Sequence, residues 1–427
     1  MGSQIVLKDD GSFRSSFYIA PHNPIHKNFT GGAPQRSRPG SEISTMKTLI
    51  KTGLTSVAAA GILVAGTATA ETISHATGYP PNSIGADAAN SFAEALKEIS
   101  GGDMTAKVYA GSLLSFSETS PGIRDGMADS GFVLLSYYPS EFPAANLAGE
   151  LSMLVDLEDV PPSHSGLAYV GALAEFVFNH CDTCVDEFAG QNQVFTGASA
   201  SSDYMLLCNK EVSTLDQLQG KRIRSAGPQW ARWAESLGAT PVTLSVSDSY
   251  EALNQGVLDC SISSSVDLDI FKLKEVVTDI TPEVPGGVYG GTAVNNVNRD
   301  VWAGLSEQQR RDVLKATAVL GAVISWDYQV GAAKELEAAE GNGITVHEAS
   351  EELQQASSEF VRSDIGKIAA NYKERHGIEN AEELAATFRE LLGKWVELTR
   401  DIDNVDDLAD LYWDELYSKV DVSSYAL

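Results

Sequence analysis

Basic side chains are scarce in this chain, which has 30 Lys and Arg residues against 58 Asp and Glu residues and a formal net charge of −28 over 427 residues. Nucleic acids and anionic membrane surfaces are bound mainly through Lys and Arg, so this balance argues against both as partners. The hydrophobic content of 43% is typical of a globular protein and excludes a mostly disordered chain. The length suits two or three domains.

The motifs of several enzyme classes are also missing. The sequence contains no Gly-x-Ser-x-Gly, no His-Glu-x-x-His, no phosphate-binding loop and no dinucleotide glycine fingerprint. The seven histidines are scattered and lack the spacing of metal ligands. We therefore expect no catalytic site, no metal and no cofactor. The glycine cluster at residues 286–291 lacks the dinucleotide spacing and indicates flexible or closely packed backbone.

Long apolar runs are absent except near the N-terminus. Residues 46–70 combine Lys47 and Lys51, an apolar core and a small-x-small end at Ala70, which is the pattern of a secretory signal cleaved after that residue. A short membrane anchor is the alternative, but Thr and Ser interrupt the stretch before it reaches the roughly 20 apolar residues of a spanning helix. Residues 1–45 are polar and are interpreted as a disordered leader or a mis-assigned gene start. We expect an exported chain without direct membrane insertion.

Cysteine occurs only four times, at Cys181, Cys184, Cys208 and Cys260. An even number in an exported protein favours disulfides over free thiols or a metal site. We favour the pairs Cys181–Cys184 and Cys208–Cys260, since the second would link two neighbouring strand-like runs. A thioredoxin-like redox role fits poorly, because the first pair follows a helical stretch at residues 164–180 rather than a strand.

Strand-like and helical segments alternate along most of the chain. Residues 71–77, 104–109 and 131–135 are strand-like, and helical periodicity separates them at 83–98 and 118–127. The alternation returns over residues 193–262. This order predicts two α/β units with a largely parallel sheet.

The chain becomes helical from Ser306 onward. Ser306 and Gln309 form a capping-box pattern, and the helix that they open is expected to run to about residue 340. A short strand can follow at residues 341–347. Amphipathic patterns then predict helices at residues 350–376, 381–400 and 405–420.

The segment at residues 215–265 carries a resemblance to a known family. It contains Leu218-Gln-Gly-Lys-Arg-Ile-Arg224, Gly238-Ala-Thr-Pro-Val242, Tyr250-Glu-Ala-Leu253 and Gly256-Val-Leu-Asp259, in this order. The order resembles that of the DctP-type solute receptors of tripartite ATP-independent periplasmic (TRAP) transporters. Weaker similarity, including Gly111-Ser-Leu-Leu and Tyr137-Tyr-Pro139, extends over nearly all of the chain after residue 70.

The resemblance implies an α/β protein of the two-lobed periplasmic binding type, with a long domain-spanning helix and a helical C-terminal region. Lobe I would comprise residues 71–196 and about 286–305, lobe II residues 197–285, and the bridging and C-terminal helices residues 306–427. The protein would be a monomer in the periplasm of a Gram-negative bacterium. It would bind a small organic acid, a carboxylate such as a dicarboxylate or a sulfonate, and deliver it to the small and large TRAP permease subunits.

The resemblance also implies that Arg224 pairs with the acid group of the ligand, and guanidinium geometry suits a carboxylate. A surface salt bridge is the alternative. Trp230 is the preferred cleft residue over Trp233, which would pack in the core; the alternative is that both tryptophans pack in the core. Many relatives carry a second Arg where Ala198 and Ser199 stand here, and often an Asn near Ser263, so the particular ligand is open. Further candidates are Tyr79, Glu118, Tyr137, Tyr138, Ser263, Tyr289, Asn295 and Asn296.

Two other functions stay open at this point. One is an exported enzyme that acts on a small acid on the same kind of scaffold. The other is a binding protein of similar fold that serves a sensor kinase or an ATP-driven importer.

Overall fold

The computed structural model describes residues 3–7, 13–17, 71–158 and 160–427. The expected signal at residues 46–70 and most of the leader lie outside the described residues, so both interpretations stay predictions. Within the leader, the strands β1 (Ser3–Leu7) and β2 (Phe13–Phe17) pair antiparallel, which differs from an entirely disordered segment. In the described part of the chain, no helix combines the length and hydropathy needed to cross a bilayer.

A mixed sheet of ten strands organises residues 71–427, in the order β4-β3-β5-β11-β7-β10-β8-β9, with β6 and β12 also pairing with β11. The strands are β3 (Glu71–Thr77), β4 (Met104–Ala110), β5 (Ser130–Leu134), β6 (Gln193–Val194), β7 (Ala198–Cys208), β8 (Arg222–Arg224), β9 (Thr240–Val242), β10 (Cys260–Ser263), β11 (Asp279–Asn298) and β12 (Thr345–Val346).

The expectation of a largely parallel sheet holds only for the outer strands. β3 is parallel to β4 and β5, and β8 is parallel to β9 and β10. The central strand β11 runs antiparallel to β5 and β7, and β7 runs antiparallel to β10. The two long central strands therefore join two lobes, one built on β3–β5 and the other on β8–β10. Where the chain divides between the lobes stays the sequence-based prediction given above.

The glycine cluster lies inside β11 and is closely packed. Gly286 and Gly287 adopt φ values of 80° and 75°, which favour glycine, and the pairing of β11 with β7 is irregular between Thr281 and Thr292. A Cβ atom at Gly290 would lie 1.8 Å from Cε1 of Tyr169. Close packing, one of the two sequence interpretations, thus accounts for these residues.

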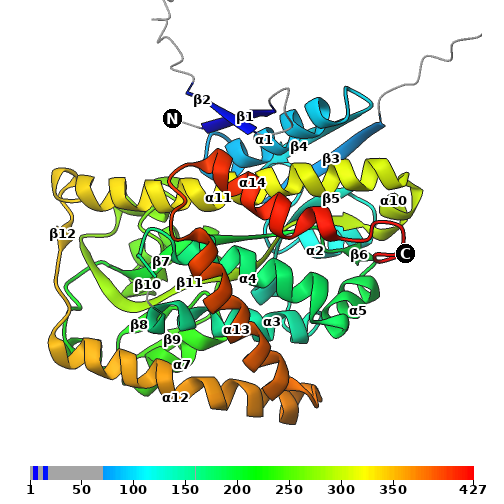
Figure 1. Cartoon of the computed structure of the whole chain (residues 1–427). Helices are drawn as coiled ribbons and strands as arrows, with labels where there is room; N and C mark the ends of the chain where they lie inside the picture. Colours follow the sequence, from blue (N-terminus) through cyan, green and yellow to red (C-terminus); the bar gives the residue numbers. More distant parts are fainter. Residues whose placement is uncertain (1–2, 8–12, 18–70, 159) are drawn as a thin grey trace, which may run out of the picture. The chain divides into compact units, whose positions relative to one another are not determined.

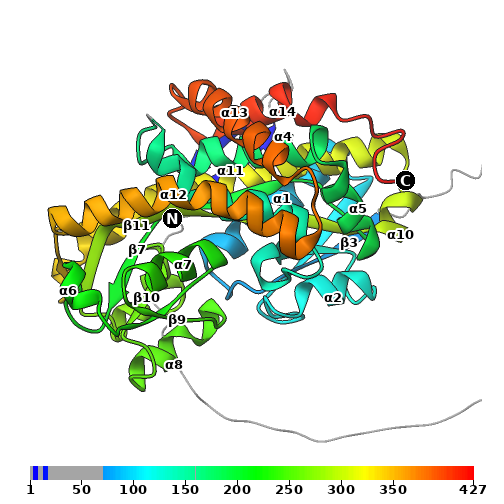
Figure 2. The same ribbon diagram turned by 90° about the horizontal axis from the view of Figure 1, so that it is seen from below.

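Helices cover the sheet, and the expected long helix is present as α11 (Glu307–Ala338), which the Ser306–Gln309 capping box opens. Figure 1 shows α11 running from the β12 end of the sheet to α10, and Figure 2 shows α12 from another side. The other helices are α1 (Ile84–Ile99), α2 (Thr119–Arg124), α3 (Pro143–Glu150), α4 (Ser165–Asn179), α5 (Asp182–Gly190), α6 (Leu215–Leu218), α7 (Pro228–Ser236), α8 (Ser249–Asn254), α9 (Asp267–Ile270), α10 (Arg299–Gly304), α12 (Glu351–His376), α13 (Ala381–Thr399) and α14 (Val405–Glu415).

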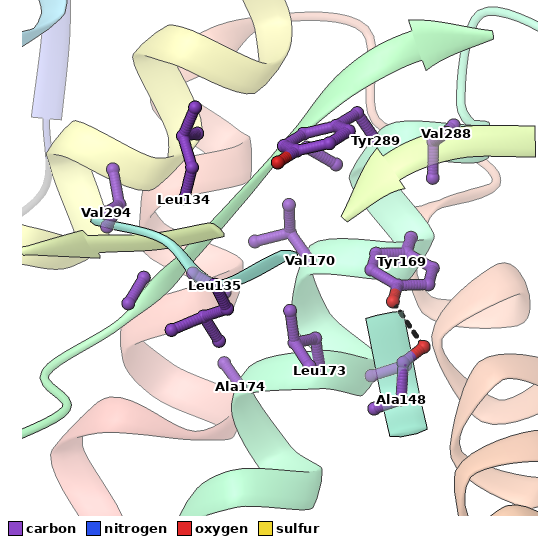
Figure 3. Close-up of a cluster of buried hydrophobic side chains, with 14 of the residues drawn as sticks. Leu134, Leu135, Ala148, Tyr169, Val170, Leu173, Ala174, Val288, Tyr289 and Val294 are labelled. Carbon is purple, nitrogen blue, oxygen red and sulfur yellow. Dashed lines mark hydrogen bonds between the residues drawn. The ribbon is translucent and has the colours of Figure 1, made fainter. Parts of the chain in front are cut away.

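The helix α4 packs against the centre of the sheet. Its residues Tyr169, Val170 and Leu173 are buried and face Leu135 and Val288 (Figure 3). The Tyr169 hydroxyl donates to the carbonyl oxygen of Ala148 at 2.7 Å. This apolar cluster fixes the stretch of β11 that carries Tyr289, a residue of the candidate site.

Both favoured cysteine pairs are disulfides in the structure. Cys208 and Cys260 lie opposite each other on β7 and β10, and Cys181 bonds to Cys184 at the start of α5. The Cys181–Cys184 pair therefore does begin a helix, although it follows α4 rather than a strand. Both of its sulfur-bearing residues are buried, which suits a structural bond better than exchange with an external thiol.

Candidate functional site

A cavity with an empty volume of about 450 Å³ lies where the two lobes meet the long strands. Its charged lining groups are Arg224 and Asp267, and its other polar lining groups include Ser199, Ser201 and Thr292. Eight aromatic side chains make up much of the wall, namely Tyr79, Phe116, Phe132, Tyr137, Tyr204, Phe271, Tyr289 and Tyr328.

Arg224 reaches the cavity from the carboxyl end of β8. It is only 2% exposed, and its guanidinium donates from Nε to the Leu244 carbonyl at 3.3 Å and from Nη1 to the Ile262 carbonyl at 3.2 Å. Nη2 donates to the Tyr137 hydroxyl at 3.5 Å. Because a guanidinium has five N–H groups, two remain available to a ligand.

No carboxylate of the described residues forms a direct ion pair with this buried cation. Among the described residues, no Asp or Glu oxygen lies within 4.0 Å of the Arg224 guanidinium, whereas Arg222 on the same strand pairs with Asp259 at 3.1 Å. A buried charge without a counter-ion is costly, and an anionic ligand would offset that cost. The surroundings of Arg224 thus suit an anion, and those of Arg222 suit an ordinary surface ion pair.

Asp267 is the second charged group of the cavity. It opens α9 just after β10, is 3% exposed, and accepts a hydrogen bond at Oδ2 from the Ser263 hydroxyl. Burial raises the pKa of this carboxyl to about 6, although the Ser263 hydrogen bond and the positive charge of Arg224 act in the opposite direction. Since β8 and β10 are parallel neighbours, their carboxyl ends place Arg224 and Asp267 at the same edge of the sheet.

Three aromatic rings stack along one side of the cavity. The ring centroid of Tyr204 lies 4.8 Å from that of Trp230 and 5.8 Å from that of Tyr289, and the Trp230 and Tyr289 centroids lie 6.1 Å apart, so the three rings form one compact cluster. Tyr204 and Tyr289 line the cavity, but Trp230 lies behind them, fully buried, with its indole N–H donated to the Gly286 carbonyl at 3.0 Å. Trp233 is equally buried. The structure therefore does not bring Trp230 to the cavity wall, because α7 turns both tryptophans into the core.

Two further tyrosines meet across the cavity. The hydroxyls of Tyr79, which follows β3, and Tyr328, on α11, lie 3.0 Å apart. Tyr137 and Tyr289 also line the cavity, and the Tyr289 hydroxyl bonds to Ser136. Of the sequence candidates, Arg224, Tyr79, Tyr137 and Tyr289 are thus brought together.

The structure places the other candidates away from the cavity wall. The Glu118 carboxylate is on the surface and accepts from Ser115, and the Tyr138 hydroxyl donates to the Phe116 carbonyl at 2.9 Å. Asn295 and Asn296 are fully buried, and their side-chain amides donate to Thr317 at 2.9 Å and Gln193 at 2.6 Å. These amides join β11 to its neighbours. Ser263 stands behind Asp267 rather than in the lining.

Most lining residues were not among the sequence candidates, and the polar ones that were missed include Tyr204, Asp267 and Tyr328. The position of Asp267, four residues after a strand end, is a signal that could have identified it. Tyr204 lies within a strand and Tyr328 within a long helix, where an aromatic residue ordinarily indicates core packing.

Comparison with known proteins gives the same family as the sequence motifs. Residues 196–371 match the family model DctP, described as bacterial extracellular solute-binding protein, family 7. This segment contains Arg224, Asp267 and Tyr328, the residues that line the cavity from β8, α9 and α11.

Solved structures of TRAP solute-binding proteins share the fold. A marine metagenome protein specific for aromatic acid ligands, from an unidentified microbe, is 18% identical, with a TM-score of 0.66 over 76% of this chain and 99% of its own. A Bordetella bronchiseptica protein with bound (R)- and (S)-mandelate is 23% identical, with a TM-score of 0.63 over 76% and 99%. A Bordetella pertussis receptor that binds pyroglutamic acid is 19% identical, with a TM-score of 0.62 over 76% and 99%. Residues 196–371 thus match the DctP family model, and the chain shares the two-lobed fold of these TRAP solute-binding proteins.

Proposed function

We propose that this protein captures a small organic acid in the Arg224 cavity and delivers it to a TRAP-type transporter. The observation that carries the proposal is the guanidinium of Arg224, which is buried, unpaired with any described carboxylate and has two N–H groups left for an anion. A carboxylate accepts two parallel N–H groups, and a low local dielectric strengthens the pairing.

The aromatic lining supports an acid with an unsaturated or cyclic body. Tyr204 and Tyr289 offer ring faces, and Phe116, Phe132 and Phe271 offer apolar contact. Three of the solved structures that share the fold are described with aromatic acids, mandelate or pyroglutamic acid as ligands. We therefore place aromatic and cyclic monocarboxylates ahead of the dicarboxylates expected from the sequence.

A thermal-shift screen of the full chain against carboxylates and matched sulfonates tests the proposal. Ligand at 100 times its dissociation constant should add roughly 2.7 kcal/mol to the free energy of unfolding. The shift should disappear in Arg224→Ala and persist in Arg222→Ala, which removes a surface cation from the same strand. A shift that survives in Arg224→Ala would refute the assignment of this residue.

The proposal has a second part. The signal is cleaved after Ala70, and the periplasmic protein then delivers its ligand to the small and large permease subunits. This second part is supported by the family match and by the signal pattern at residues 46–70. The mass of the exported chain tests it: the N-terminus should be Glu71, and a chain that retains residues 1–45 would contradict it. Turnover of a bound acid would instead support the enzyme alternative.

A further inference from the structure

We propose that Asp267 is a second recognition group, and that the ligand is an acid that also carries a hydroxyl or N–H donor directed at this carboxylate. The inference rests on the proposed function, because it concerns the same cavity. It narrows the ligand from any small acid to one with two polar groups: an anion for Arg224 and a hydrogen-bond donor for Asp267.

One oxygen of Asp267 is already held by the protein and the other is not. Ser263 donates to Oδ2 and so fixes the orientation of the carboxylate. Oδ1 is buried and has no hydrogen-bond partner among the described residues. Asp267 lines the cavity, so a molecule that occupies the cavity lies next to this carboxylate. Buried polar atoms are usually satisfied, and a ligand donor would satisfy this one.

Arg224 does not donate a hydrogen bond to Oδ1 of Asp267. Both residues line the cavity, yet no ion pair within 4.0 Å joins them. Arg224 instead donates to the Leu244 and Ile262 carbonyls, which hold its guanidinium in place. The separation leaves the two opposite charges available to different groups of one ligand.

The remaining polar neighbours are mostly engaged with one another. The Tyr328 hydroxyl lies 3.0 Å from that of Tyr79 and is also near enough to the Asp267 carboxylate to lower its pKa, and the Ser199 and Thr292 hydroxyls lie 2.9 Å apart. A simple acid bound at Arg224 would therefore bring its negative charge near Asp267 without giving Oδ1 a proton donor. An acid with a suitably placed hydroxyl or N–H removes that mismatch, and unmatched buried polar groups are the strongest source of ligand discrimination.

Matched pairs of acids test this in the wild-type full chain by titration calorimetry. The pairs are mandelate with phenylacetate, 3-hydroxyphenylacetate with phenylacetate, and pyroglutamate with cyclopentanecarboxylate. For at least one pair, the donor-bearing acid should bind at least tenfold more tightly than its analogue. Equal or tighter binding of the donor-free analogue in every pair that binds would overturn the inference, and this comparison requires no variant.

Two variants locate the effect. Asp267→Asn keeps the shape but removes the charge, so the affinity ratio within the selective pair should fall by about tenfold. Asp269→Asn, on the exposed side of the same helix, should leave the ratio unchanged. An unchanged affinity ratio in a folded Asp267→Asn variant would overturn the inference. The proposed function would still stand in that case if binding depends on Arg224. If no acid in the panel binds, the proposed function fails and this inference fails with it.

Discussion

The hydroxyl of Tyr137 accepts a hydrogen bond from the backbone N–H of Val246 at 3.0 Å. Tyr137 follows β5 and Val246 follows β9, so this bond joins the two lobes beside the cavity. The neighbouring Ser136 hydroxyl makes a similar connection by donating to the Ala226 carbonyl at 3.2 Å. The lobes are therefore held together by groups that also surround Arg224.

Tyr137→Phe is expected to weaken ligand affinity about fivefold, because one hydrogen bond between the lobes contributes about 1 kcal/mol. Titration calorimetry with an acid found in the screen measures the change. Tyr138→Phe is the matched control, since its hydroxyl bonds to the Phe116 carbonyl and lies outside the cavity lining. Equal effects of the two variants would show that the Tyr137 hydroxyl makes no specific contribution to ligand affinity.

Arg224→Lys should weaken binding by more than tenfold although the positive charge is kept. An ammonium group cannot reproduce the fixed guanidinium fork that holds two carbonyls and still offers two N–H groups. Arg222→Lys should bind the same acid with unchanged affinity, because Arg222 is half-exposed and paired with Asp259. Unchanged affinity in Arg224→Lys would mean that this residue does not contact the acid group.

Asp267→Asn should stabilise the ligand-free protein at neutral pH. The pKa of Asp267 is raised from 3.8 to about 6 in the folded state, so the folded state binds more protons than the unfolded state between these values. Stability is therefore lost as the pH rises from about 4 to about 6, by about 3 kcal/mol for this one group.

Urea unfolding of the ligand-free protein at pH 4 and pH 7 measures this effect. The advantage of Asp267→Asn over the wild type should grow by up to about 3 kcal/mol between the two conditions. Asp269→Asn is the control, because Asp269 is exposed and paired with Lys274. A pH-independent difference between Asp267→Asn and the wild type would contradict the raised pKa.

Loss of the Cys208–Cys260 disulfide should cost more stability than loss of Cys181–Cys184. The sequence separations are 52 and 3 residues, and the entropy lost by the unfolded chain grows with loop length. The expected costs are about 4 and about 2 kcal/mol. Paired Cys→Ala variants, compared by urea unfolding, measure both. A larger loss for the Cys181–Cys184 variant would show that native packing, rather than loop entropy, dominates.

Local sequence patterns were sufficient for much of the fold. Capping residues and hydrophobic periodicity placed α1, α11 and α12 within one or two residues of their observed ends. Arg224 could be singled out because the strand, turn and helix around it form a contiguous motif. The cysteine pairing followed from two strand-like runs that proved to be neighbours. Helix ends depend on residues that are close together in the sequence. Arginine and cysteine are residue types with few alternative roles, so they could be recognised without the tertiary structure.

Only the tertiary structure decided what faces the cavity. The antiparallel pairing of β7 and β11 was not visible in an alternating strand–helix pattern, because strand direction depends on partners far apart in the chain. Tyr328 and Tyr204 come to the ligand cavity from a helix and a strand that look like ordinary core elements, while Trp230 turns behind them. Asp267 acquires its raised pKa from burial, against the opposing charge of Arg224, and no single segment carries this property. Chemistry-bearing residue types can be recognised locally, but their solvent exposure and their neighbours are set by how distant segments pack.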